Sequence, residues 1–233
     1  MRSKESTVKN LMQEVESRKK QLLNRIMKWA ETNLREFPWR QSPSPYEVLI
    51  AEILLKRTTS TAVKNLFPRF IREYLDINKL ARAETGDLQQ RLAPLGYHKE
   101  RARIFKEVAT QIIQRHDGKV PRTKTDLLEI RHIGEYTANA ILSLGYGIPS
   151  AMVDSNGKRI ITRLFSMHFL RKPSLKVVQE IADLLSPIEN NQKYNYALLD
   201  LGALICRYGT PKCGLCPIRR LCDFGSSGRP NVE

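Results

Sequence analysis

The sequence predicts an all-α protein, and three observations support that prediction. Apolar residues recur at the three- and four-residue spacing of a helix along most of the chain. The strict alternation of apolar and polar residues that is typical of a half-buried strand is hard to find. Proline and glycine stand between the periodic stretches, as in FPW at 37–39 and PLG at 94–96, and end them. We therefore expect about nine or ten short helices joined by turns.

The periodic stretches give the positions of the expected helices. In chain order they are 22–34, 46–55, 62–75, 103–115, a helix–turn–helix over 126–147, 159–170, 177–186 and 196–205. Residues 1–12 and 226–233 lack such a pattern, so we expect loose ends there. With 233 residues, 41% of them hydrophobic, the chain can bury one large core or two small ones.

The charge balance points to a polyanionic partner. Lysine and arginine number 39 against 24 acidic residues, which gives a formal net charge of +15. Nucleic acid is the partner that such an excess favours, although a generally basic proteome is the alternative explanation. The chain has no apolar run of about 18 residues and no apolar signal-peptide core near its start, so we expect no membrane association and a cytoplasmic, nucleoid-associated protein.

The four cysteines form the most specific local pattern. They are Cys206, Cys213, Cys216 and Cys222, with intervals of six, two and five residues. In a chain expected to lie inside the cell, such clustering indicates a metal site rather than disulfides. Sulfur-only ligation suits a 4Fe–4S cluster or tetrahedral zinc. The uneven intervals lack the two paired C-x2-C motifs of a zinc ribbon, which favours the cluster.

Residues 130–138, IRHIGEYTA, are expected to form a tight turn between two helices. Backbone N–H groups at such a turn and at the start of the next helix can bind a phosphate. Gly134 would permit close backbone approach. Taken alone, the turn is equally well an ordinary connection between helices.

Two acidic residues stand out by their surroundings. Asp154 precedes a helical stretch, where capping the helix is its ordinary role. Glu52 lies in the apolar run YEVLIAEILL at 46–55, and burying a carboxylate there is unfavourable without a purpose or a partner. A structural carboxylate with satisfied hydrogen bonds is the alternative reading of Glu52.

In their order along the chain, these motifs resemble those of the helix–hairpin–helix, iron–sulfur DNA glycosylases of the endonuclease III and MutY superfamily. The resemblance spans 33–224 and includes FPWR, EILLKRTT, the hairpin, VDSN and the cysteine spacing. EILLKRTT resembles the L-R-R-T-T pattern of the thymine–guanine mismatch glycosylases more than the E-x-x-L-Q-Q-T pattern of MutY. The hairpin departs from the family's L-P-G-V-G-x-x-T-A, because Arg131 replaces the proline and His132 replaces the first glycine. Any positive φ at that glycine must then be tolerated by histidine.

The resemblance implies the domain organisation and the cofactor. A six-helix barrel domain with the helix–hairpin–helix would span 38–148. Residues 1–37 and 149–233 would form an iron–sulfur cluster domain, and a DNA-binding cleft would lie between the two. The four cysteines would hold a 4Fe–4S cluster with a mainly structural role, and the protein would act as a monomer.

The resemblance also implies catalytic roles for three residues, with Glu52 and Tyr136 facing Asp154 across the cleft. Asp154 would stabilise the oxocarbenium-like sugar or orient the attacking water. Tyr136 stands where strand-cleaving members have a lysine, and a phenol cannot form a Schiff base, so base hydrolysis without lyase activity is expected. Glu52 would face the flipped base and protonate it or bind its polar edge.

Further residues are expected to contact double-stranded DNA. Arg57 aligns with the residue that fills the space left by the flipped base, and it could pair with the widowed guanine, although Lys56 and Arg57 could instead meet only phosphate. Tyr97 would act as a wedge between bases. The remaining expected DNA contacts are Thr58, His98, Arg131, His132, Ile133, Gly134, Thr137 and Asn156.

The function expected from these residues is that of a monofunctional glycosylase of base excision repair, which removes thymine or uracil mispaired with guanine after base flipping. The alternative is a MutY-like adenine glycosylase that acts opposite 8-oxoguanine or guanine. The chain stops soon after Cys222, whereas MutY enzymes typically carry a further domain that reads 8-oxoguanine. A third possibility, a non-catalytic DNA-binding or redox iron–sulfur protein, would not need Asp154, Tyr136 and Glu52 together.

Overall fold

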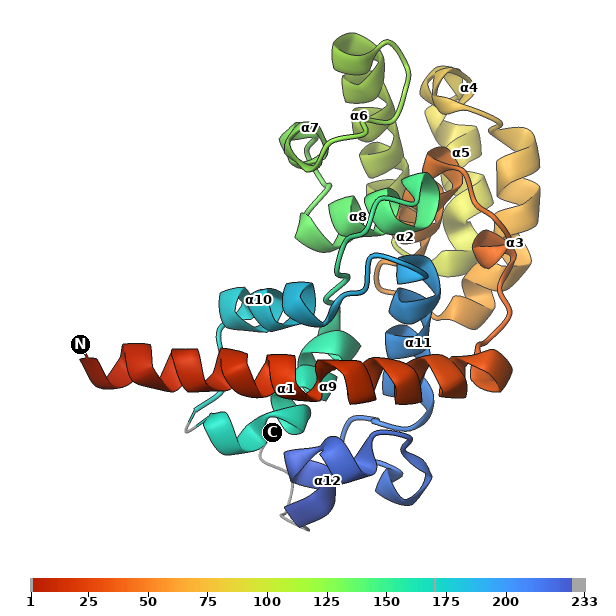
Figure 1. Cartoon of the computed structure of the whole chain (residues 1–233). Coiled ribbons are helices and arrows are strands. Elements are labelled where there is room, and N and C mark those ends of the chain that lie inside the picture. The colour runs from red at the N-terminus through yellow and green to blue at the C-terminus, as the bar shows by residue number, and fades with distance from the viewer. Residues whose placement is uncertain (1, 170, 228–233) are drawn as a thin grey trace. The chain divides into compact units, whose positions relative to one another are not determined.

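The computed structural model describes residues 2–169 and 171–227, and every regular element within them is a helix (Figure 1). The all-α prediction is therefore confirmed. The α-helices are α1 (Arg2–Asn33), α2 (Pro45–Leu55), α3 (Ser60–Glu73), α4 (Ile77–Arg82), α5 (Thr85–Leu92), α6 (His98–His116), α7 (Lys124–Glu129), α8 (Glu135–Ala140), α9 (Ser155–Leu164), α10 (Leu175–Leu185), α11 (Asn191–Leu204) and α12 (Asp223–Ser227).

Shorter helical turns connect several of these helices. The 3-10 turns are η1 (Pro38–Arg40), η2 (Ala93–Leu95), η4 (Ser166–His168), η5 (Cys213–Leu215) and η6 (Arg219–Leu221). A π-helical turn, η3 (Ile141–Gly145), follows α8 directly. Within the described part of the chain, no helix is long and apolar enough to cross a membrane.

The chain divides into two compact units. The terminal unit comprises Met1–Arg35 and Pro149–Glu233, so helices from both ends of the sequence build it. The central unit is the continuous segment Glu36–Ile148. Of the loose end expected over 226–233, only its first two residues are described, and they end α12.

In the terminal unit, the long helix α1 packs along α10 and α11, and α9 packs against the same two helices (Figure 1). The expectation of a loose end over residues 1–12 is wrong, because α1 begins at Arg2. Its residues Leu11 and Val15 are buried and continue a stripe that includes Leu22. Many charged residues stand between these positions, so the apolar stripe is not evident in the sequence.

In the central unit, α2 is the helix around which others pack. It contacts α3, α6 and η3, and six of its eleven residues are buried. Its start is fixed by a capping box, because the Ser44 hydroxyl accepts the N–H of Glu47 while the Glu47 carboxylate accepts the N–H of Ser44. This helix carries Glu52, and the Lys56–Arg57 segment follows its last residue.

The predicted helix–turn–helix is present as α7, a turn and α8. Beyond α8, η3 crosses α2 so closely that only glycine fits at Gly145. A Cβ atom added there would lie 2.6 Å from the Cα of Pro45. The helix α8 that follows the turn is thus continued by a segment, η3, that packs tightly on α2.

Candidate functional site

Asp154 is the N-cap of α9, as its position in the sequence predicts. Its Oδ1 accepts the N–H of Gly157 at 2.7 Å, and its Oδ2 accepts the side-chain amide of Asn156 at 2.8 Å. Burial raises the pKa of the Asp154 carboxyl, and these hydrogen bonds and the positive charge of Arg159 oppose that rise. The result is a half-buried carboxylate with both oxygens held by the first turn of its own helix.

A second layer of hydrogen bonds joins Asp154 to the start of the cysteine motif. Arg159 donates from Nη2 to the Asn156 Oδ1 at 2.7 Å and to the Gly202 carbonyl at 3.0 Å. Its Nε donates to the carbonyl of Cys206 at 2.7 Å. The side chain of Asn156, which we expected to contact DNA, therefore uses both ends of its amide within the protein, on Asp154 and on Arg159.

The close packing of α11 on α9 makes this arrangement possible. A Cβ atom added at Gly202 would lie 2.4 Å from the Cβ of Asn156, so a larger residue there would displace the asparagine. Sequence reasoning missed Arg159 and Gly202. Their partners lie in other helices, and no local pattern distinguished Arg159 from the other basic residues of the chain.

The pH dependence of the expected base release should change when Arg159 is replaced. Replacing Arg159 by glutamine removes the positive charge that lowers the pKa of Asp154, so this pKa should rise further above its usual range. If the ionised carboxylate is the active form, activity is lost as the pH falls through that pKa. The acidic limb of the single-turnover rate profile should therefore move to higher pH.

Lys158→Gln provides the matched control for this experiment. It removes one positive charge from the same helix but leaves Arg159, whose positive charge lowers the pKa of Asp154. An acidic limb that moves equally in both variants, or in neither, would show that Arg159 does not tune the carboxylate.

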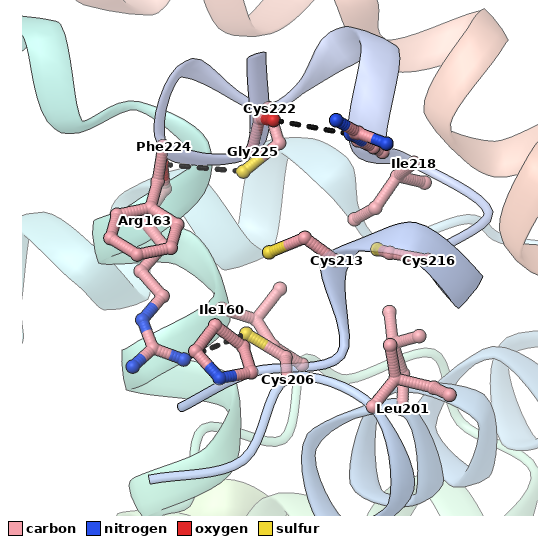
Figure 2. A pocket seen from close by; sticks show the side chains of 13 residues that line it. Ile160, Arg163, Leu201, Cys206, Cys213, Cys216, Ile218, Cys222, Phe224 and Gly225 are labelled. Atoms are coloured by element: carbon pink, nitrogen blue, oxygen red, sulfur yellow. Dashed lines mark hydrogen bonds between the residues drawn. The ribbon is translucent and has the colours of Figure 1, made fainter. Parts of the chain in front are cut away.

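The four cysteine side chains line one pocket of the terminal unit (Figure 2). Cys206 follows α11, Cys213 begins η5, Cys216 follows η5, and Cys222 follows η6. Arg163 packs beside them and donates from Nη1 to the Cys206 sulfur at 3.4 Å. The remaining lining is largely apolar and includes the side chains of Ile160, Leu201 and Phe224.

This pocket supplies the sulfur-only donor set that the sequence motif predicts. Burial, reinforced by the neighbouring sulfurs, raises the pKa of the Cys216 thiol to about 11 and that of Cys222 to about 12. Among the described residues, no three cysteine, histidine or acidic groups are arranged so that they could hold a metal ion as they stand. The four thiols thus suit a sulfur-ligated centre in their chemistry and in their location.

In the central unit, Glu52 is half-buried on the last full turn of α2. Lys56 lies one helical turn further on, and its ammonium donates to the carbonyl of His132 at 2.8 Å. Burial lowers the pKa of Lys56, and the nearby negative charge of Glu52 opposes this effect. The end of α2 is thereby joined to the turn between α7 and α8.

The hairpin turn places His132, not Gly134, in the left-handed region. The φ of His132 is 76°, whereas Gly134 is the extended N-cap of α8 with a φ of −102°. The expectation that this histidine must adopt the conformation of the replaced glycine is therefore confirmed. The His132 side chain lies on α6, where its Nε2 is 2.7 Å from the Glu107 Oε2.

Arg131 reaches the same carboxylate of α6. Its Nη1 lies 3.3 Å from the Glu107 Oε2, and its backbone N–H donates to the Gln111 side chain at 2.9 Å. Its side chain nevertheless remains 68% exposed. Glu107 and Gln111 were not predicted from the sequence, because they lie on α6 and are separated from the hairpin turn by α7.

Two expected DNA contacts of the hairpin have buried side chains. Ile133 and Thr137 are each only 5% exposed, and the N–H of Ile133 already donates to the carbonyl of Ile130 at 3.1 Å. Only backbone groups of these residues could therefore meet a ligand. Gly134 is exposed with open space around it, and Tyr136 is half-buried in the first turn of α8.

Arg57 and Tyr97, which the sequence suggested separately, lie together. The guanidinium of Arg57 sits over the Tyr97 ring, 5.3 Å from its centroid. Both residues are exposed, and both have a positive φ, 55° for Arg57 and 49° for Tyr97. Thr58 follows Arg57, and half-buried His98 begins α6 directly after Tyr97.

These helices, the hairpin and the polar residues on them define a known class of protein. Residues 50–187, more than half of the chain, match the model of the HhH-GPD superfamily of base excision DNA repair proteins. The chain belongs to this superfamily, so the family expected from the motifs is confirmed. The matched segment contains Glu52, the hairpin and Asp154, and it ends before the cysteines.

Individual relatives carry more specific names. A thymine/uracil-DNA glycosylase of Methanothermobacter thermautotrophicus is 32% identical over 208 residues, which cover 89% of this chain and 94% of that protein. An adenine DNA glycosylase of Buchnera aphidicola is also 32% identical, over 188 residues, but the match covers only 53% of its length.

Solved structures agree with this assignment. A thermostable thymine-DNA glycosylase superposes with a TM-score of 0.86 at 32% identity, over 91% of this chain and 98% of that one. Endonuclease III in a trapped covalent complex with DNA superposes with a TM-score of 0.78 at 24% identity, over 91% of this chain and 98% of that one. The second likeness supports the fold alone.

Proposed function

We propose that this protein is a monofunctional DNA glycosylase that removes thymine or uracil mispaired with guanine. The observation that carries the proposal is the match to a relative named as a thymine/uracil-DNA glycosylase over nearly the full length of both chains. The segment Lys56-Arg57-Thr58-Thr59, in place of the Q-Q-T pattern, also favours the mismatch enzyme.

The proposed reaction breaks the bond between C1′ of the sugar and the base. The bonding electrons leave with the base, and the sugar develops positive charge. Asp154, held by Gly157 and Asn156, stabilises that charge and orients the water that adds to C1′. Glu52 binds the polar edge of the extruded base or gives it a proton. Tyr136 offers no amine, so the abasic product is released without strand cleavage.

The proposed DNA contacts follow from exposure and charge. In this proposal, the exposed residues Arg57 and Tyr97 act on the base stack, and the exposed Lys56 and Arg131 side chains and the backbone at Gly134 bind phosphate. The substrate is double-stranded DNA with a mispaired base, on which the enzyme acts as a cytoplasmic, nucleoid-associated monomer. The central unit would be the helix–hairpin–helix barrel domain, and the terminal unit would be the cluster domain.

We further propose that Cys206, Cys213, Cys216 and Cys222 hold a 4Fe–4S cluster. Their thiols line one pocket, and sulfur alone is the ligand set that such clusters use. The cluster would cross-link the chain from the end of α11 to the start of α12. It would thereby hold Cys206, whose carbonyl accepts a hydrogen bond from Arg159, in place. Its role in this proposal is structural.

The colour and metal content of the protein test the cluster. Protein purified without oxygen should be brown, with about four iron atoms per chain, and its broad visible absorption should bleach on oxidation. Cys216→Ser should lose the colour together with thermal stability. A colourless wild-type protein with one zinc per chain would contradict the assignment.

A panel of duplexes tests the proposed activity. Each duplex carries T·G, U·G, A·G or A opposite 8-oxoguanine, and hot alkali after incubation converts every abasic site into a strand break. Cleavage of the T·G and U·G duplexes only after alkali supports a monofunctional glycosylase. Intact DNA throughout, with retained binding, would favour a non-catalytic protein.

A further inference from the structure

The pair formed by Arg57 and Tyr97 has an unusual backbone. Both residues adopt a left-handed conformation that side chains with a Cβ atom rarely favour. Such a conformation persists only where the surrounding structure imposes it. Arg57 follows α2 and Tyr97 precedes α6, so the imposed conformations bring two loops that are distant in the sequence into one exposed stack.

The buried side chain of Arg101 connects these two loops. It lies on the first turn of α6 and is 3% exposed. From Nη1 it donates to the carbonyls of Ile53 at 2.6 Å and Leu54 at 3.0 Å. From Nη2 it donates to the carbonyl of Lys56 at 3.0 Å. Its own backbone N–H donates to the carbonyl of Tyr97 at 2.8 Å.

The Arg101 guanidinium constrains the peptide that precedes Arg57. The Lys56 carbonyl belongs to the peptide that enters Arg57, so its orientation limits the φ that Arg57 can take. The Tyr97 carbonyl is the first hydrogen-bond acceptor of α6. The Arg101 side chain thus ties the peptide before Arg57 to the first turn of α6, the helix that begins directly after Tyr97.

The chemistry of arginine suits this task. Its planar guanidinium presents several N–H donors in a rigid fork, whereas lysine offers a single nitrogen. The Arg101 side chain donates to the carbonyls of Ile53 and Leu54 in the last turn of α2 and to that of Lys56 just after it, where a positive charge also meets the negative end of the helix dipole. A buried cation in such a place needs hydrogen-bond acceptors of this kind.

We propose that Arg101 is a positioning residue that holds Arg57 and Tyr97 as one paired wedge, which enters the base stack as the target base leaves it. The inference deepens the proposed function and rests on it, because it assumes that a base is extruded from the duplex. The stacked guanidinium and ring are both flat and exposed, as a group that inserts between bases must be. If Arg101 only packed the core, its loss would affect every activity alike.

The experiment compares a paired uracil with one that needs no extrusion. Single-turnover rates are measured on uracil opposite guanine in a duplex and on the same uracil in a single strand. Arg101→Lys should lower the duplex rate by about tenfold to a hundredfold, because extrusion from the duplex is the step that the wedge assists. The single-strand rate should stay within about threefold. Arg115→Lys, which changes another carbonyl-bound arginine of α6, should alter neither rate.

Equal losses on both substrates, or no loss on either, would overturn the proposal. Exposed variants keep it falsifiable if Arg101→Lys does not fold. For a paired wedge, Arg57→Ala/Tyr97→Ala should be little worse on duplex uracil than the worse single variant. Effects of Arg57→Ala and Tyr97→Ala that multiply in the double variant would mean that the two residues act separately.

A binding measurement separates this inference from the proposed function. A fluorescent 2-aminopurine placed beside the mismatch brightens when its neighbour is unstacked. Wild type should brighten it and Arg101→Lys should not, while Arg115→Lys should behave as wild type. If wild type releases no base from any substrate but still brightens the probe in an Arg101-dependent manner, the proposed function fails and the wedge stands. If wild type leaves the probe dark, the wedge fails.

Discussion

Replacing Asp154 by asparagine is expected to lower the rate of base release by about a thousandfold or more, which corresponds to about 4 kcal/mol of transition-state stabilisation. Asparagine is an equally good N-cap, so its Oδ1 can still accept the N–H of Gly157 and preserve the first turn of α9. The variant therefore keeps the helix cap and removes the negative charge, together with the acceptor for the Asn156 side-chain amide. Binding to a T·G duplex should stay within about threefold of wild type, because the lost charge acts on the developing cation.

Single-turnover kinetics and a gel-shift titration on the same duplex measure the two quantities. Asp183→Asn provides the control, because it removes an exposed carboxylate of α10 in the same unit. Near-wild-type release by the Asp154 variant would remove this residue from the mechanism. Loss of binding together with release would instead point to a damaged α9.

Replacing Tyr136 by lysine is expected to create a strand-cleaving activity, which the proposed monofunctional wild type should lack. Residue 136 lies at the start of α8, and by the resemblance noted in the sequence the new amine would stand where strand-cleaving members have theirs. It can attack C1′ as the base leaves and form an imine, from which the strand is cut by elimination. Borohydride reduces such an imine to a stable protein–DNA adduct, which a denaturing gel resolves.

Wild type and Tyr136→Phe should give no adduct, because neither carries an amine at this position. A strong adduct in wild type would mean that another lysine serves as nucleophile, and the enzyme would then be bifunctional. No adduct in the lysine variant, despite retained base release, would mean that residue 136 does not approach C1′.

Much of the fold could be predicted, because the long helices have apolar faces that repeat over several turns. The stretches expected at 46–55 and 177–186 correspond closely to α2 and α10. The short helices α4 and α5 were missed. Each has at most eight residues, so too few turns are present for a periodic pattern to emerge. The first half of α1 was missed because its buried positions stand among many charged ones.

In the candidate site, too, local patterns could be predicted from the sequence and long-range contacts could not. Asp154 and the cysteine motif are local patterns, since the cap precedes its helix and the cysteines lie close together in the chain. Glu107 and Arg159 act through partners in other helices, and the sequence does not pair them. Arg101 did leave a signal, because it shares the buried face of α6 with Phe105 and other apolar residues. A positive residue on such a face predicts a buried role.

The central claim, that thymine or uracil opposite guanine is the substrate, is tested most directly by comparing single-turnover rates side by side. The same sequence context should carry T·G, U·G and A opposite 8-oxoguanine, with enzyme in excess. We expect thymine and uracil to be released at least about a hundredfold faster than adenine, with uracil no slower than thymine, because a pocket that accepts the methyl group discriminates weakly against the smaller base. Faster release of adenine than of thymine would contradict this account and assign a MutY-like activity.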